Sequence, residues 1–179
     1  MGEAKYGEEF ITHEFDEAIA IQQAIVDGAQ KLTTAHSRAA SKQLIKTTLR
    51  EDEKYLRELR RLGKKHDATG KVEGVALALK ELMDETDQSA AEAPSESYEA
   101  HAVLINLKRK QQDSAAAMLK IAREQKDTDL RDAATQFGKA TKASAQELAD
   151  DLALFAVEIA TMRSNGARSA APKAPSLRR

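Results

Sequence analysis

The stretch IAIQQAIVDGAQKL, residues 19–32, has a counterpart in KRKQQDSAAAMLKI, residues 108–121, and this pair decides the fold. Gln22-Gln23 falls on Gln111-Gln112 at an offset of 89 residues. Around both stretches, apolar residues recur at alternating steps of three and four, which is the period of an amphipathic helix. The chain is therefore predicted to be a duplicated helical hairpin, and a duplicated hairpin builds an all-α four-helix bundle.

The composition agrees with one helical domain. The chain has 179 residues, enough to bury a core, and only 4% of them are aromatic. It has no cysteine, which excludes disulfides and thiolate metal sites and fits a cytoplasmic location. The first residues lack the apolar core of a secretory signal, and no apolar run is long enough to cross a membrane. The charge pattern does not indicate nucleic-acid binding by the folded part.

The apolar spacing divides the chain into four long helices, predicted at residues 8–33, 37–62, 95 onwards and 128–162. Residues 71–86 also show helical spacing and predict a short crossover helix between the hairpins, followed by a flexible joint at 89–96. Gly63 is expected to stop the second helix and Ser95 to cap the third. The bundle is assigned to residues 1–163, and the basic Ala/Pro/Ser-rich segment 164–179 is predicted to be a disordered tail.

Six polar residues interrupt the apolar stripes at equivalent depths in the two halves: Gln22, Asp52, Tyr55, Gln111, Thr141 and Ser144. Two amides flanked by hydroxyl groups predict a closed hydrogen-bonded layer, which fixes the register of the helices and needs no metal ion. Asp52 is the exception because a buried carboxylate must be protonated or hydrogen-bonded. Tyr55 or Arg50 is its predicted partner, although Arg50 is expected to face outward.

With this layer inside a duplicated hairpin, the chain resembles the ferritin-like superfamily, including rubrerythrin-type proteins and uncharacterised ferritin-like stress proteins. The resemblance implies one Glu and one Glu-x-x-His motif from each hairpin, which together hold two iron or manganese ions. The two Glu positions hold Gln22 and Gln111 here, and the two motifs hold Asp52-x-x-Tyr55 and Thr141-x-x-Ser144. One carboxylate of four remains and both imidazoles are lost. No metal, cofactor or catalytic residue is therefore expected, and iron or manganese is the alternative.

The other titratable residues are assigned to solvated positions. His13 and His101 lie near predicted helix starts, where a surface or intersubunit site is the alternative. His36 lies in the first turn between helices, and His66 lies beyond Gly63. The charged runs Glu51-Asp52-Glu53 and Lys108-Arg109-Lys110 are expected to wrap around their helices, and the basic run is expected to be a solvated face.

The last four residues, Ser176, Leu177, Arg178 and Arg179, resemble the end of peptides that dock ferritin-like cargo inside encapsulin shells. The resemblance implies that Leu177 fills a pocket of the shell. Pro175 stands where those peptides have Gly, so the match is partial. The alternatives are an unstructured solubilising end and a basic tail that contacts nucleic acid or an acidic partner.

The sequence therefore favours a non-enzymatic, metal-free bundle that serves as a structural or interaction protein. The resemblance implies a stress response and a homodimer. Two alternatives stay open: a di-iron or di-manganese oxidase or ferroxidase, and encapsulin cargo addressed by the tail.

Overall fold

The computed structural model describes residues 2–72, 74, 77 and 94–162, and within this part it confirms the all-α four-helix bundle. Its elements are α1 (Gly2–Ala35), α2 (Ala39–Gly63), the short 3-10 helix η1 (Lys64–His66), α4 (Pro94–Gln125) and α5 (Thr128–Thr161). No described helix is long and apolar enough to cross a membrane. The predicted tail and nearly all of the predicted crossover helix lie outside the described residues.

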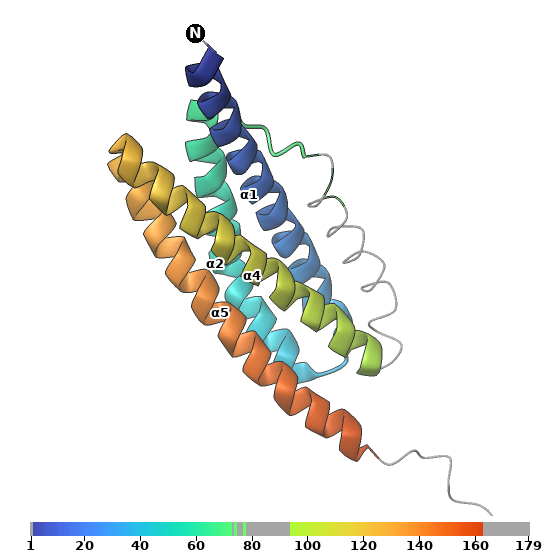
Figure 1. Ribbon diagram of the computed structural model, residues 1–179. Helices are drawn as coiled ribbons and strands as arrows, with labels where there is room; N and C mark the ends of the chain where they lie inside the picture. The colour runs from blue at the N-terminus through green and yellow to red at the C-terminus, as the bar shows by residue number, and fades with distance from the viewer. Residues whose placement is uncertain (1, 73, 75–76, 78–93, 163–179) are drawn as a thin grey trace, which may run out of the picture.

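The two hairpins pack against each other as antiparallel pairs. α1 contacts α2 and α4, and α5 contacts α4 and α2, so α2 and α4 lie diagonally across the bundle. In Figure 1 the α4–α5 hairpin lies obliquely across the α1–α2 hairpin, and the last turns of α5 extend beyond the other helices. The sequence repeat is thus reflected in the arrangement of the helices.

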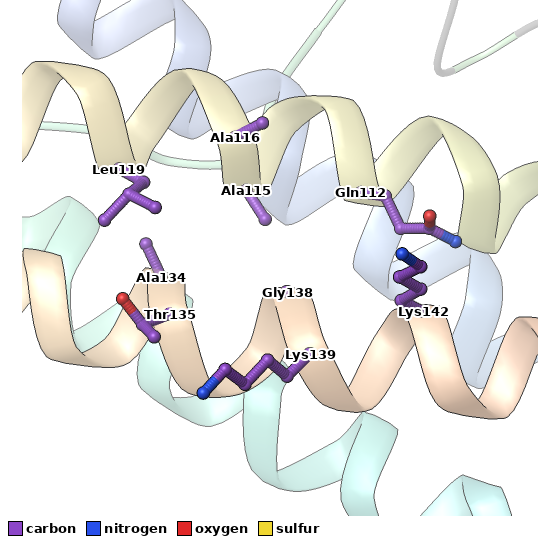
Figure 2. A pocket seen from close by; sticks show the side chains of 9 residues that line it. All are labelled: Gln112, Ala115, Ala116, Leu119, Ala134, Thr135, Gly138, Lys139 and Lys142. Atoms are coloured by element: carbon purple, nitrogen blue, oxygen red, sulfur yellow. The ribbon is translucent and has the colours of Figure 1, made fainter.

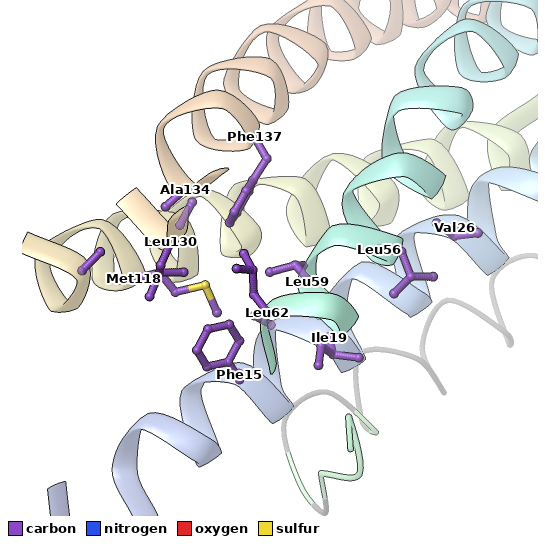
Figure 3. Packing of buried hydrophobic residues seen from close by; sticks show 13 residues of the cluster. Phe15, Ile19, Val26, Leu56, Leu59, Leu62, Met118, Leu130, Ala134 and Phe137 are labelled. Atoms are coloured by element: carbon purple, nitrogen blue, oxygen red, sulfur yellow. The ribbon is translucent and has the colours of Figure 1, made fainter. Parts of the chain in front are cut away.

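The apolar core has two parts. One cluster lies toward the α1–α2 turn and includes Ile25, Leu32, Ile45, Leu104 and Leu148. The other lies toward the opposite end of the bundle (Figure 3) and includes Phe15, Leu59, Leu62, Met118 and Phe137. On α2, α4 and α5 a buried polar residue separates the two clusters, and Gln22 of α1 lies at the same depth, so a polar layer crosses the middle of the bundle.

Two helix ends differ from the prediction. Gly63 does end α2, but its φ of −60° is right-handed, and the left-handed residue is Asp67, after η1 (φ 55°). Space around Gly63 is tight, since a Cβ there would lie 3.0 Å from Cδ1 of Ile19. α4 begins at Pro94, so Ser95 lies inside the first turn and does not precede it as a cap.

The α4–α5 turn follows a familiar pattern. Lys126 is left-handed (φ 58°), and the Asp127 amide donates to the Ala122 carbonyl at 2.9 Å, which closes α4 with a Schellman motif. The Asp127 side chain then accepts a hydrogen bond from the Leu130 amide at 3.0 Å and caps α5. These two bonds fix the point at which the second hairpin reverses.

Candidate functional site

The polar layer in the middle of the bundle is built by one or two buried side chains from each long helix. They are Gln22 of α1, Asp52 of α2, Lys108 and Gln111 of α4, and Thr141 of α5, and none is more than 2% exposed. Four of these five were predicted from the sequence. The basic run 108–110 was predicted to be a solvated face, and for Lys108 that prediction is wrong.

A buried ion pair dominates the layer. Nζ of Lys108 lies 2.7 Å from Oδ1 and 2.6 Å from Oδ2 of Asp52, and it bridges the diagonal between α4 and α2. Burial raises the pKa of the Asp52 carboxyl, and the Lys108 ammonium opposes that shift. Burial of either charge alone would be costly. The contact between the two opposite charges offsets part of this desolvation cost. The predicted partners of Asp52, Tyr55 and Arg50, are therefore incorrect.

The two glutamines bind main-chain carbonyls, and they do not bind each other. Nε2 of Gln22 donates to the Asp52 carbonyl at 3.0 Å, and Nε2 of Gln111 donates to the Ala18 carbonyl at 3.3 Å. The side-chain oxygens of both glutamines and of Thr141 are buried without a partner among the described residues. The layer is therefore held by an ion pair and two amide donors, and the predicted closed network of side chains is not formed.

The last two predicted members of the layer, Tyr55 and Ser144, lie at its edge. Tyr55 is partly buried and packs on Phe137, with ring centroids 5.9 Å apart. The Ser144 hydroxyl donates to the Thr141 carbonyl of its own helix at 3.1 Å. Both residues line a groove of about 210 Å³ between α2 and α5 that reaches Asp52.

A local signal could have revealed Lys108. It follows Leu104 by four residues and precedes Gln111 by three, so it shares the inward stripe of α4. Lys108 is the first of three consecutive basic residues, and such a run usually indicates a solvated face, so its inward position is not obvious. A buried Asp52 on a facing helix also requires a cation, and only a lysine or arginine on an inward stripe can provide one.

These residues do not fit a two-metal centre. Both Asp52 oxygens bind an ammonium group, and the other donors at the expected ligand positions are neutral amides and hydroxyls, which bind iron and manganese weakly. Among the described residues, no group of three or more His, Asp or Glu side chains is placed to hold a metal ion. Lys108 would also repel an incoming divalent cation.

A second polar cluster lies where the α1–α2 turn meets α4 and α5. Its members are His36, Arg38, Ser41, Ser97, His101, Asp151 and Glu158. The Arg38 guanidinium binds Asp151 and Glu158, the Ser41 hydroxyl donates to Asp151 at 2.6 Å, and the Ser37 amide donates to Ser97 at 2.9 Å. The cluster joins the start of α2 to the second half of α5 and the start of α4.

The two histidines of this cluster are fully buried, with 0% exposure, so the prediction that both are solvated is wrong. Burial lowers the pKa of His36 to about 4, with a further lowering from His101. Burial also lowers the pKa of His101 to about 4, opposed by Asp151. Both rings are therefore neutral at pH 7. By contrast, His13 is exposed and His66 stacks on Phe15 at a centroid distance of 4.9 Å.

A shallow groove of about 320 Å³ between α4 and α5 is lined mainly by small side chains (Figure 2). Ala115, Ala134 and Gly138 form its floor, and Lys139 and Lys142 lie at its rim. Its described lining includes no carboxylate, imidazole or thiol. The helices approach closely here, since a Cβ on Gly138 would lie 3.4 Å from that of Ala115.

No protein-family model matches the sequence, and no curated protein is significantly similar to it. We therefore infer the function from the geometry of these two polar clusters.

Proposed function

We propose that this chain is a ferritin-like bundle in which an internal ion pair takes the place of metal ions, and that it acts as a non-enzymatic structural or interaction protein. The observation that carries the proposal is the contact of Nζ of Lys108 with both oxygens of Asp52. In a metal-dependent bundle, bound cations balance the charge of buried carboxylates. Here the charge of the Asp52 carboxylate is balanced by the ammonium group of Lys108, a residue of the same chain.

Elemental analysis of the full chain, purified without chelators, tests this proposal. A second sample is incubated anaerobically with Fe²⁺ or Mn²⁺ and desalted, so that loss of metal during purification is controlled. Less than one metal ion per chain, an unchanged melting temperature with chelator, and no acceleration of Fe²⁺ oxidation are expected. About two ions per chain, or accelerated oxidation, would support the alternative of a di-iron or di-manganese oxidase.

We further propose that the bundle forms a homodimer through the outer face of α5. Leu154 and Val157 are 60% and 62% exposed and lie three residues apart in α5, so they share one face of this helix. Light scattering after size exclusion should give twice the chain mass. The L154K/V157K variant should give the monomer mass, while T47K, at an exposed site on α2, should stay dimeric. A monomeric wild-type protein would exclude the dimer.

The tail supports a separate proposal about location. Ser176, Leu177, Arg178 and Arg179 lie outside the described residues, so the sequence alone supports a role as a cytoplasmic encapsulin address. Deletion of residues 175–179 should abolish co-purification with a shell protein and leave the helical content unchanged. A truncated chain that still co-purifies with the shell protein would show that the tail is not the address. A role in a stress response rests on the resemblance alone.

A further inference from the structure

Two buried imidazoles join three parts of the fold at one end of the bundle. The rings of His36, in the α1–α2 turn, and His101, in α4, meet edge to face with centroids 5.4 Å apart. His36 also contacts the ring of Phe155 in α5 at a centroid distance of 5.1 Å. The turn, α4 and α5 are thus held together through side chains that can change charge within an ordinary range of pH.

The hydrogen bonding of His36 suits the neutral ring only. The Arg38 amide donates to Nδ1 of His36 at 3.0 Å, so this nitrogen must keep its lone pair. A second proton on the ring would have to enter at Nδ1 and would break this bond. Arg38 is the residue before α2, so the bond that would break lies at the start of this helix. The Arg38 side chain makes no capping hydrogen bond there.

The surroundings of the two rings disfavour an added positive charge. His36 faces Arg38 and Lys42 at the start of α2, His101 from α4 and Asp151 from α5. His101 faces Asp151 and Arg38, and the Leu148 carbonyl favours a proton on its ring. Asp151, the nearby carboxylate that acts on both rings, already binds Arg38 and Ser41. Nε2 of His36 and both ring nitrogens of His101 are buried without a hydrogen-bond partner at good geometry in the described part of the chain.

We propose that His36 and His101 form an acid-sensitive latch, which holds the α1–α2 turn against α4 and α5 and releases it when either ring is protonated. The opposite end of the bundle stays closed, because the cluster around Phe15, Leu62 and Phe137 is made of apolar side chains. Acid therefore opens one end of the bundle and exposes the apolar residues behind the latch, including Leu32, Leu104 and Phe155.

Hydrogen exchange measured by mass spectrometry at pH 7 and pH 5, corrected for the intrinsic rate, tests the latch in the full chain. A ring with its ordinary pKa of 6.5 when released and a pKa of about 4 when closed favours opening by about 20-fold over this interval. Peptides covering residues 36–45, 97–104 and 148–156 should therefore lose protection at pH 5, and peptides covering 15–19 and 115–122 should not. Equal loss at both ends would mean global unfolding and would overturn the proposal.

The matched variant is His36→Asn with His101→Gln. The side-chain oxygen of the introduced asparagine can still accept the Arg38 amide in an Asx turn, and neither new side chain titrates. Protection of this variant at the latch end should be the same at both pH values. The control His13→Gln, at an exposed site, should keep the wild-type behaviour. An unchanged acid response in the double variant would contradict the latch.

A measurement on the wild-type chain covers the case in which the double variant does not fold. The ring protons of His36 and His101 are followed by NMR as the pH is lowered. Neither ring should titrate in the closed bundle near pH 6.5, and their titration should coincide with the loss of protection at the latch end. Titration of both rings near pH 6.5 with the latch peptides still protected would overturn the proposal.

Discussion

At the scale of single residues, the most unusual feature is an ammonium group buried in the centre of the bundle. The Lys108 and Asp52 side chains are 0% and 3% exposed, so neither charge has access to bulk water. A buried pair of this kind contributes little net stability compared with apolar residues, but the loss of one partner leaves the other charge uncompensated. The pair therefore acts mainly on the specificity of the packing.

Removal of either partner should be costly, and removal of both should be less costly than the sum. Asp52→Asn and Lys108→Met should each lower the free energy of unfolding by about 3–5 kcal/mol, because each leaves a buried charge unpaired. The double variant should recover part of this loss. Lys110→Met is the control, since its partly exposed bond to Glu17 should contribute less than about 1 kcal/mol. Urea denaturation measures all four, and additive losses would show that the two side chains are not coupled.

The glutamines of the layer give a second prediction. Gln22→Glu or Gln111→Glu should lower the free energy of unfolding at pH 7 by roughly 1–3 kcal/mol, because the amide donor is lost and a carboxylate oxygen faces a main-chain carbonyl. Gln136→Glu, at an exposed position of α5, should have almost no effect. Thermal unfolding compares the three variants. Stabilisation by either buried Glu without metal would contradict this account of the layer.

At the scale of helices and turns, close approach decides where small residues are needed. Gly63 and Gly138 both lie in helical conformation, and they differ in the room around them. A Cβ on Gly63 would meet Ile19 at 3.0 Å and Ala68 at 3.2 Å, whereas a Cβ on Gly138 would make an ordinary contact with Ala115 at 3.4 Å. A side chain at position 63 would therefore require Ile19 of α1 or Ala68 to move.

These two glycines form a matched pair for mutation. Gly63→Ala should destabilise the bundle by about 1–3 kcal/mol, because the overpacking outweighs the gain in helix propensity of about 1 kcal/mol. Gly138→Ala should be neutral or slightly stabilising for the same propensity reason. Chemical denaturation of the two variants measures the difference. Equal stabilisation by both would show that Ile19 moves aside at no cost.

The helices could be predicted from the sequence because their signal is local. The three-and-four spacing placed the second and fourth helices within about two residues of their observed ends. The partners of the polar residues could not be predicted in the same way, because they depend on which stripes face each other across the bundle. Lys108 and His101 were both assigned to solvent, although each lies on the inward stripe of α4 with Leu104. For these two residues, the position on the apolar stripe predicts burial better than the type of side chain does.

At the scale of the whole molecule, the distribution of buried titratable groups determines the response to pH. His36 and His101 have pKa values of about 4 in the folded chain and an ordinary value of 6.5. The unfolded chain therefore binds more protons between these values, and stability is lost as the pH falls. The raised pKa of Asp52 acts in the opposite direction, so the loss is assigned to the histidines.

The free energy of unfolding should fall by about 2 kcal/mol for one imidazole between pH 7 and pH 5, and should approach a loss of about 3 kcal/mol near pH 4. Urea denaturation at pH 7, 6 and 5 measures the slope. The variant with His36→Asn and His101→Gln should show a flatter dependence, whereas the His13→Gln control should retain the wild-type slope. A wild-type stability that stays constant down to pH 5 would mean that the rings are protonated in the folded chain without penalty.

The diagonal placement of the central ion pair has a consequence for assembly. Lys108 and Asp52 belong to different hairpins and lie 56 residues apart, so neither hairpin can bury its own half of the pair favourably. Two preformed hairpins must lose the water around both charges in the same step in which their apolar faces meet, so the desolvation cost of the pair falls at docking. A hairpin from a second chain offers the same charge at the same depth. Exchange of hairpins between two chains would therefore satisfy the pair as well as a single chain does, and concentrated refolding is the condition that favours it.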